Sequence, residues 1–320
     1  MNPIGGYFEL ELTDRGGFPH DNGVLLNSGR NALEYVFRAL GDVKHLYVPY
    51  YTCDVVMEPV KKFNITYTFY HINQSLELDV LPTLNDGEYL IYTNYFGVKD
   101  RYVKRLAAYY GSRLIVDNAQ AWFAETVEGV STIYSPRKYV GVPDGGVAYC
   151  PKHLDEIMFG QDFSYERCAH LLKRIDMSPS DGYADFKATS KTLVGQPIKK
   201  MSKLTKTILA SIDFEEIKTR RIQNFEYLHK HLSETNLLQL PSLDSFACPM
   251  VYPYLLNDAK LKQQLIKNNV FVATYWPNVF EWCKPEDWEY ALAERTVFVP
   301  IDQRYGKEDM DRIINVVKQL

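Results

Sequence analysis

The 320-residue sequence contains no run of about 18 consecutive apolar residues, the length that a membrane-spanning helix requires. It has no excess of basic residues either: Lys plus Arg number 36, Asp plus Glu number 40, and the net charge is −4. A weakly acidic chain without a basic run is a poor candidate for nucleic-acid binding. The beginning of the sequence lacks the charged and apolar regions of a secretion signal. We therefore expect a cytoplasmic protein that binds neither nucleic acid nor a membrane.

Cysteine is scarce, and several common site signatures are absent. The five cysteines are widely spaced and form no Cys-x-x-Cys pair, which argues against a zinc ribbon and against a disulfide framework. The chain also lacks the glycine-rich dinucleotide signature, the P-loop, the zincin helix motif and the hydrolase nucleophile elbow. No metal site is expected, and any catalytic chemistry must come from another arrangement.

The chain is long enough for two domains, and its 46% hydrophobic and 24% charged residues are ordinary for a globular protein. Strand-like and helix-like patterns alternate to about residue 150, which predicts an α/β fold with a mostly parallel central sheet and helices on both faces. Helical patterns then dominate to about residue 235. Three further strands are predicted at Val251–Leu256, Val270–Ala273 and Thr296–Val299, within a smaller α+β unit. We expect a large domain over residues 1–205 and a small C-terminal domain over residues 206–320.

The first candidate site lies at a predicted helix start. Apolar residues recur at helical spacing from Ala32 to Leu40, and Ser28 is a suitable N-cap. Gly29 would let the backbone approach an anion closely, and the helix dipole favours a phosphate there. An ordinary capped helix explains the same residues, so both interpretations remain open.

Two further candidates follow predicted strands. Asp117 ends an apolar strand, with Gln120 three residues later; a carboxylate there could hold a ligand nitrogen protonated or simply cap a turn. Ser135-Pro136-Arg137-Lys138 follows the next strand, and a partly buried lysine amine can become nucleophilic, although a solvated basic turn is the common alternative. Ligands bind at the carboxyl ends of strands in such sheets. Together, a phosphate-type helix start, a carboxylate and a lysine suit pyridoxal 5′-phosphate.

With these motifs in order, the sequence resembles the fold-type I pyridoxal-phosphate aminotransferases. Within them, it is similar to the DegT/DnrJ/EryC1/StrS family of sugar aminotransferases. The segments that carry the resemblance lie between about residues 25 and 150 and read LNSGRNAL, YVPYYTCDVV, LIVDNAQAWF and SPRKYVGVPDGGVAY. The C-terminal half matches only loosely.

The resemblance implies a role for each candidate residue. Lys138 would bond covalently to the cofactor and move the proton, and Asp117 would pair with the pyridine nitrogen. Gln120 would contact the side of the ring that carries the hydroxyl. The phosphate would receive backbone N–H groups from Gly29 and Arg30 and the hydroxyl of Ser135.

One cofactor position departs from the family pattern. Cys53 stands just after Thr52, where the family often has an aromatic residue that stacks on the ring. Ring stacking would then come from Tyr51 or Tyr95, or be replaced by a contact with the sulfur of Cys53.

The resemblance also implies the activity and the assembly. We expect a homodimer with shared active sites that moves an amino group from an amino acid, glutamate by resemblance, to a keto-sugar. The sugar would be linked to a nucleotide and used in the synthesis of cell-surface polysaccharides or related sugars. Two alternatives are an aminotransferase with a non-sugar keto acceptor and a non-catalytic binding protein of the same fold.

Overall fold

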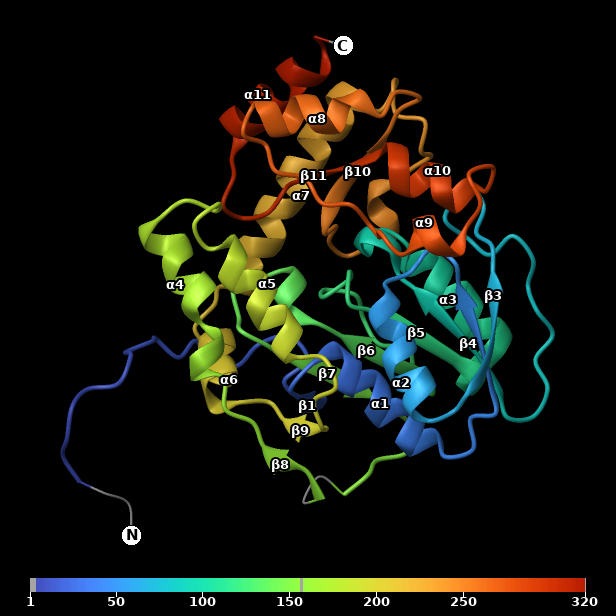
Figure 1. Ribbon diagram of the computed structural model, residues 1–320, viewed down its shortest axis with the longest axis vertical. Coiled ribbons are helices and arrows are strands. Elements are labelled where there is room, and N and C mark those ends of the chain that lie inside the picture. The colour runs from blue at the N-terminus through green and yellow to red at the C-terminus, as the bar shows by residue number, and fades with distance from the viewer. Residues whose placement is uncertain (1–3, 156–157, 320) are drawn as a thin grey trace.

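The computed structural model describes residues 4–155 and 158–319. In this part of the chain, nine strands form one large sheet and two form a small sheet (Figure 1). The large sheet has the order β3-β2-β4-β5-β6-β7-β1-β9-β8. In that order, the strands are Thr66–Tyr70, His45–Pro49, Glu88–Thr93, Leu114–Asn118, Ser131–Tyr134, Gly146–Tyr149, Val24–Leu26, Lys199–Lys200 and Gly160–Gln161.

Strands β3, β2, β4, β5 and β6 are parallel to one another. Strand β7 is antiparallel to both of its neighbours, β6 and β1. The predicted α/β fold with a mostly parallel sheet is therefore confirmed. Because β4, β5 and β6 are adjacent and parallel, the segments that follow them leave the sheet at the same edge.

Helices cover both faces of the large sheet. In β4, Ile91 belongs to one buried cluster, and its neighbours Leu90 and Tyr92 belong to the other, as the alternation of a strand requires. The first cluster includes helices α1 (Gly29–Leu40) and α2 (Met57–Lys62), and the second includes α3 (Asp100–Tyr110). The sequence defines α1 well: the hydroxyl of Ser28 accepts the N–H of Asn31, and Gly41, with φ 85°, ends the helix.

The second cluster continues from the large sheet into the C-terminal unit, so the two units share a core. The C-terminal unit contains the antiparallel strands β10 (Val251–Leu255) and β11 (Thr296–Pro300). Its helices α7 to α11 span Phe214–Leu232, Lys260–Lys267, Val279–Trp282, Trp288–Arg295 and Lys307–Val317. Helices α4 (Ala169–Asp176), α5 (Tyr183–Thr192) and α6 (Lys203–Ala210) connect it to the large sheet. No helix in the described residues is long and apolar enough to cross a membrane.

One predicted strand is wrong. Residues 270–273 form no ladder; Ala273 makes a single bridge to Phe298 of β11. Val270 is buried in the core and Val272 packs partly against it, so side-chain packing alone accounts for the apolar pattern. The flanking predictions at β10 and β11 are confirmed.

Gly146 provides a test of how tightly the start of β7 packs. A Cβ atom at this position would lie 2.2 Å from the carbonyl oxygen of Ser28 and 2.7 Å from the nitrogen of Gly29. We expect Gly146→Ala to lower the free energy of unfolding by about 1–3 kcal/mol, because the backbone must shift. Gly160→Ala is the control, since a Cβ there would have no atom within 4 Å. Equal unfolding midpoints in urea for the two variants would contradict this packing.

Candidate active site

The predicted site residues meet at the carboxyl edge of the parallel strands. Asp117 lies opposite Thr93 of β4 and Ile133 of β6 in the sheet register. Directly after β6, residues Pro136–Lys138 form a short 3₁₀ turn. The parallel arrangement therefore brings Asp117 and Lys138 to the same place, and each affects the pKa of the other.

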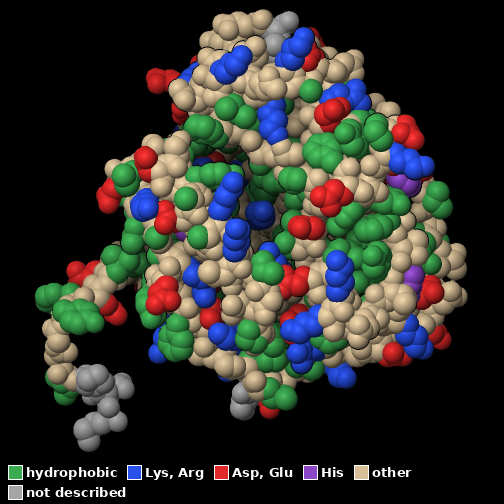
Figure 2. Space-filling model, viewed as in Figure 1, with side chains coloured by type: hydrophobic (Ala, Val, Ile, Leu, Met, Phe, Trp, Pro, Cys, Tyr) green, Lys and Arg blue, Asp and Glu red, His purple; other side chains and the backbone are tan. Residues whose placement is uncertain are grey.

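Lys138 lies in a cavity of about 530 Å³. The walls come from the Lys138 turn, helices α4, α5 and α7, and the loop after β11. On this side of the molecule, Figure 2 shows a central hollow with basic side chains at its mouth and in its depth. The side chain of Lys138 is exposed to the open space of the cavity, although enough protein surrounds its amine to remove part of its hydration.

The environment of Lys138 lowers the pKa of its amine. Burial is the main cause, and the cations Arg137 and Arg30 add to it, whereas Cys53 and Asp117 act in the opposite direction. Among the described residues, the amine makes no hydrogen bond or ion pair. An amine with a lowered pKa and no partner is suited to attack a carbonyl carbon.

Asp117 is a buried carboxylate beside that amine. Burial raises its pKa from 3.8 to about 6, and two effects oppose the rise: the N–H of Ala119, which donates at 2.9 Å, and the charge of Lys138. These two effects offset only part of the cost of burial, so a protonated ring nitrogen close by would stabilise the carboxylate further. It therefore fits a ligand that brings a basic nitrogen.

The third predicted group lies beside Asp117. The side-chain oxygen of Gln120 accepts the N–H of Phe96 at 3.0 Å, but its buried Nε2 has no hydrogen-bond partner. A buried amide without a partner costs free energy that a ligand acceptor would recover. This orphan donor is an observation, independent of the resemblance, that the site is built for a ligand.

The predicted phosphate groups also come together. A Cβ atom on Gly29 would lie 3.6 Å from Cβ and 3.9 Å from Oγ of Ser135, so the start of α1 adjoins the serine that precedes Lys138. Helix α1 directs the positive end of its dipole there. The side chain of Arg30 is paired with Glu58 at 3.0 Å, which leaves its backbone N–H as the group suited to an anion. The donors present therefore fit pyridoxal phosphate.

Cys53 lies within electrostatic reach of Lys138. Burial raises the pKa of its thiol, and the charge of Lys138 lowers it. Tyr51 and Tyr95 are fully buried, and the hydroxyl of Tyr95 donates to the carbonyl of Tyr51 at 2.9 Å. Cys53 stays the predicted contact for the ring, because its thiol and the Lys138 amine affect each other's pKa.

Sequence reasoning missed a group from the C-terminal unit. Arg221 of α7 and Gln303 both donate to the backbone carbonyl of Tyr139, at 3.1 and 3.0 Å. The hydroxyl of Tyr139 in turn donates to the carbonyl of Gln120 at 2.8 Å. The residue after Lys138 is thereby fixed to both units. No local signal marks Arg221 or Gln303, because each lies in an ordinary helix or loop pattern.

Tyr275 also approaches the site from the C-terminal unit. Burial raises the pKa of its phenol to about 12; Arg221 lowers the pKa and Cys53 raises it. The phenol thus lies within electrostatic reach of a predicted cofactor contact and of the arginine that fixes the Lys138 turn. No local pattern distinguishes Tyr275 from the other tyrosines among the 24 in the sequence.

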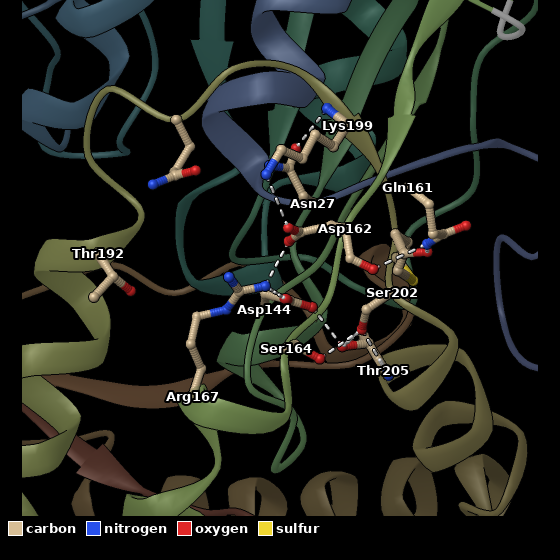
Figure 3. A network of polar contacts seen from close by, with 12 residues as sticks. Asn27, Asp144, Gln161, Asp162, Ser164, Arg167, Thr192, Lys199, Ser202 and Thr205 are labelled. Atoms are coloured by element: carbon tan, nitrogen blue, oxygen red, sulfur yellow. Dashed lines mark hydrogen bonds and ion pairs between the residues drawn. The ribbon is translucent and has the colours of Figure 1, made fainter.

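A buried polar network supports the segment between Lys138 and β7 (Figure 3). Asp144 accepts hydrogen bonds from Arg167 and from Thr205 of α6. Arg167 also pairs with Asp162 at 2.5 Å, and Asp162 is 3.4 Å from the amine of Lys199. These contacts anchor the residue that immediately precedes Gly145 and Gly146, which pack against the start of α1. Among the residues that the structure describes, no cluster of His, Cys, Asp or Glu could hold a metal.

Comparison with known proteins identifies the fold. No protein-family profile matches the chain, and no curated protein matches it significantly. Solved structures do match. A sugar aminotransferase, CalS13 from Micromonospora echinospora, has 14% identity and a TM-score of 0.62; the match covers 92% of this chain and 86% of that one.

Two other solved aminotransferase structures also match most of the chain. A DegT DnrJ EryC1 StrS aminotransferase from Brucella abortus has 16% identity and a TM-score of 0.58, with 92% of this chain and 85% of that one covered. NtdA from Bacillus subtilis, solved with the bound cofactor PMP, has 13% identity and a TM-score of 0.63, with 92% and 72% covered. The chain therefore has the fold of the fold-type I aminotransferases, as its sequence predicted.

The raised pKa of Asp117 predicts a pH dependence of stability in the cofactor-free protein. The folded state binds this proton more tightly than the unfolded state, so the resulting stability is full below pH about 4 and is lost as the pH rises through about 6. We expect the wild type to lose about 3 kcal/mol relative to Asp117→Asn between pH 4 and 7.5, measured by urea unfolding. Asp181→Asn, at an exposed position where hydrogen bonds lower the pKa, serves as the control. If the free energy of unfolding changed with pH to the same extent in the wild type and in Asp117→Asn, the carboxylate would not be desolvated.

Proposed function

We propose that this protein is a pyridoxal-phosphate-dependent aminotransferase of the DegT/DnrJ/EryC1/StrS family. Its substrates would be an amino acid, with glutamate as the expected donor, and a keto-sugar linked to a nucleotide. The observation that carries the proposal is the Lys138 amine of lowered pKa, which lines a cavity and interacts electrostatically with the buried Asp117 carboxylate. The shared fold and the orphan amide of Gln120 support it.

Each residue would have a distinct task toward the cofactor. Lys138 would hold it covalently and, once displaced by the donor, carry a proton on Nζ between the two carbon positions of the reaction. Asp117 would keep the pyridine nitrogen protonated. When bound, the cofactor supplies an electron sink for the negative charge that develops beside the amino nitrogen. Gly29, Arg30 and Ser135 would bind the phosphate, Gln120 would donate to the ring hydroxyl, and Cys53 would contact the ring.

The shape of the surface beside Lys138 supports a long, anionic acceptor. A second cavity, of about 600 Å³, shares Arg174, Pro179 and Arg304 with the Lys138 cavity. It extends to Arg312 of α11. Arg304 is neutralised by Asp302, with contacts of 2.7 and 2.9 Å, but Arg174 and Arg312 pair with no carboxylate in the described part of the chain. A diphosphate between a sugar at Lys138 and a nucleoside farther out suits this distribution.

Two further parts of the proposal concern the setting. All five cysteines are free, which suits the reducing cytoplasm as the compartment. By resemblance, two copies would assemble into a dimer that shares its active sites. Both statements are independent of which acceptor the enzyme uses.

The half-reaction with the donor tests the function directly. Purified protein mixed with pyridoxal phosphate should develop a visible absorbance band, and glutamate should remove it as the cofactor takes up the amino group. Lys138→Ala should show no protein-bound band and lose at least about 1,000-fold in turnover, because both the covalent link and the proton carrier are gone. Lys152→Ala is a matched control outside the cavity lining. Full turnover in Lys138→Ala would refute the mechanism, and a band that no amino donor changes would favour a binding protein.

The acceptor is tested separately. We expect turnover with nucleotide-linked keto-sugars and little with simple keto acids. Arg312→Gln should raise the KM for the nucleotide-linked acceptor about tenfold and leave the rate of the glutamate half-reaction unchanged, since Arg312 lies at the far end of the second cavity. Stopped-flow absorbance measures the half-reaction, and steady-state kinetics measure the KM. Activity with keto acids alone would exclude the sugar acceptor.

A further inference from the structure

The amino-terminal residues form an extended arm that leaves the body of the protein. The chain first contacts the body firmly at Arg15, whose N–H donates to the carbonyl of Ala210 at 2.8 Å and whose side chain pairs with Asp213 at 3.2 Å. Residues 4–11, which we call the arm, have neither helix nor strand structure. Figure 1 shows the arm directed away from the sheet and the helices.

The arm carries large apolar side chains in full contact with solvent. Ile4, Tyr7 and Phe8 are 102%, 99% and 93% exposed, and Leu10 is 66% exposed. Four exposed apolar side chains within seven positions make an apolar-rich segment, and exposed apolar surface of this kind marks a place that another molecule covers. Glu9 and Glu11 lie between and beside them, so the segment is also acidic.

A second exposed apolar surface lies on the same side of the molecule. Helix α4 buries none of its residues, and α5 buries only Thr189. An amphipathic helix normally packs its apolar side against the protein, but Leu172 and Ile175 of α4 are 56% and 81% exposed, and Met177 after it is 52% exposed. Figure 1 places α4, α5 and the departing arm along one flank. We call the exposed face of these two helices the α4–α5 face.

The charges of the two surfaces are complementary. Lys187 and Lys191 of the α4–α5 face have no carboxylate partner in the described part of the chain. The arm offers Glu9 and Glu11. Because both surfaces are on one flank, a two-fold axis through that flank would let each copy give its arm to the other and receive one in return. Residues 4–14 can reach about 35 Å when extended, enough to cross such an interface.

We propose that the arm of one copy docks on the α4–α5 face of a second copy, so that arm exchange holds the dimer together. The inference rests on the proposed dimer but not on the proposed reaction. It has a consequence for the site, because Ile175, Tyr183 and Phe186 of this region also line the Lys138 cavity. The partner's arm would therefore support one wall of the cavity.

Sedimentation equilibrium of the full chain tests the proposal. Deletion of residues 4–11, or Tyr7→Ser with Phe8→Ser, should weaken dimer association at least tenfold. The control is Tyr67→Ser with Val80→Ser, which removes two other exposed apolar groups, 43% and 73% exposed, from β3 and the loop that follows it. If deletion of the arm left the dissociation constant of the dimer unchanged, the proposed role of the arm would be refuted. A full-length chain that is monomeric would refute the proposed dimer as well.

A double-mutant comparison identifies the docking face. Leu172→Ser with Met177→Ser should weaken the dimer by itself but add little once the arm is deleted, because the same contact is already lost. Independent, additive losses would show that the arm binds elsewhere. Protection of Phe8 from chymotrypsin should increase with protein concentration; protection that is independent of concentration would mean that the arm folds back on its own chain. These readouts need no substrate, so they stay informative if the proposed reaction is wrong.

Discussion

The backbone contact between Gly146 and Ser28 is the constraint on which the candidate site depends. It leaves no room for a side chain, and it joins the start of β7 to the turn that opens α1. The segment that carries Ser135 and Lys138 ends at this contact, so the lysine is held beside a helix N-terminus. Asp144, with its partners Arg167 and Thr205, fixes the same segment from the other side. The geometry of the site thus follows from backbone packing.

The electrostatics of the site are unbalanced in a way that suits an anion. Arg30 and Arg137 both lower the pKa of Lys138, and Asp117 is the carboxylate that counteracts them most directly. A bound phosphate would offset the positive charge, and a ring nitrogen would compensate Asp117. The orphan Nε2 of Gln120 completes the set. Protein interiors rarely leave several polar groups unpartnered in one place unless a ligand is meant to fill it.

Much of the fold and of the candidate site could be predicted from the sequence, because these features depend on local patterns of residues. Strand–helix alternation predicted the parallel sheet, and Ser28, Asp117 and Lys138 could be placed at strand ends from flanking apolar runs. Arg221, Gln303 and Tyr275 could not be found this way, since only the packing of the C-terminal unit on the large sheet brings them near Lys138. The strand expected at residues 270–273 failed for a related reason: an apolar run shows that side chains are buried, not that the backbone joins a ladder.

The central claim is that Lys138 is the amine that captures the cofactor. The most direct measurement is to incubate the protein with pyridoxal phosphate, reduce it with borohydride, and locate the attached phosphopyridoxyl group by peptide mass spectrometry. The account predicts a single modified residue, Lys138, with modification that persists at low cofactor concentration and declines in Asp117→Asn. Attachment spread over surface lysines, with Lys138 unmodified, would contradict it.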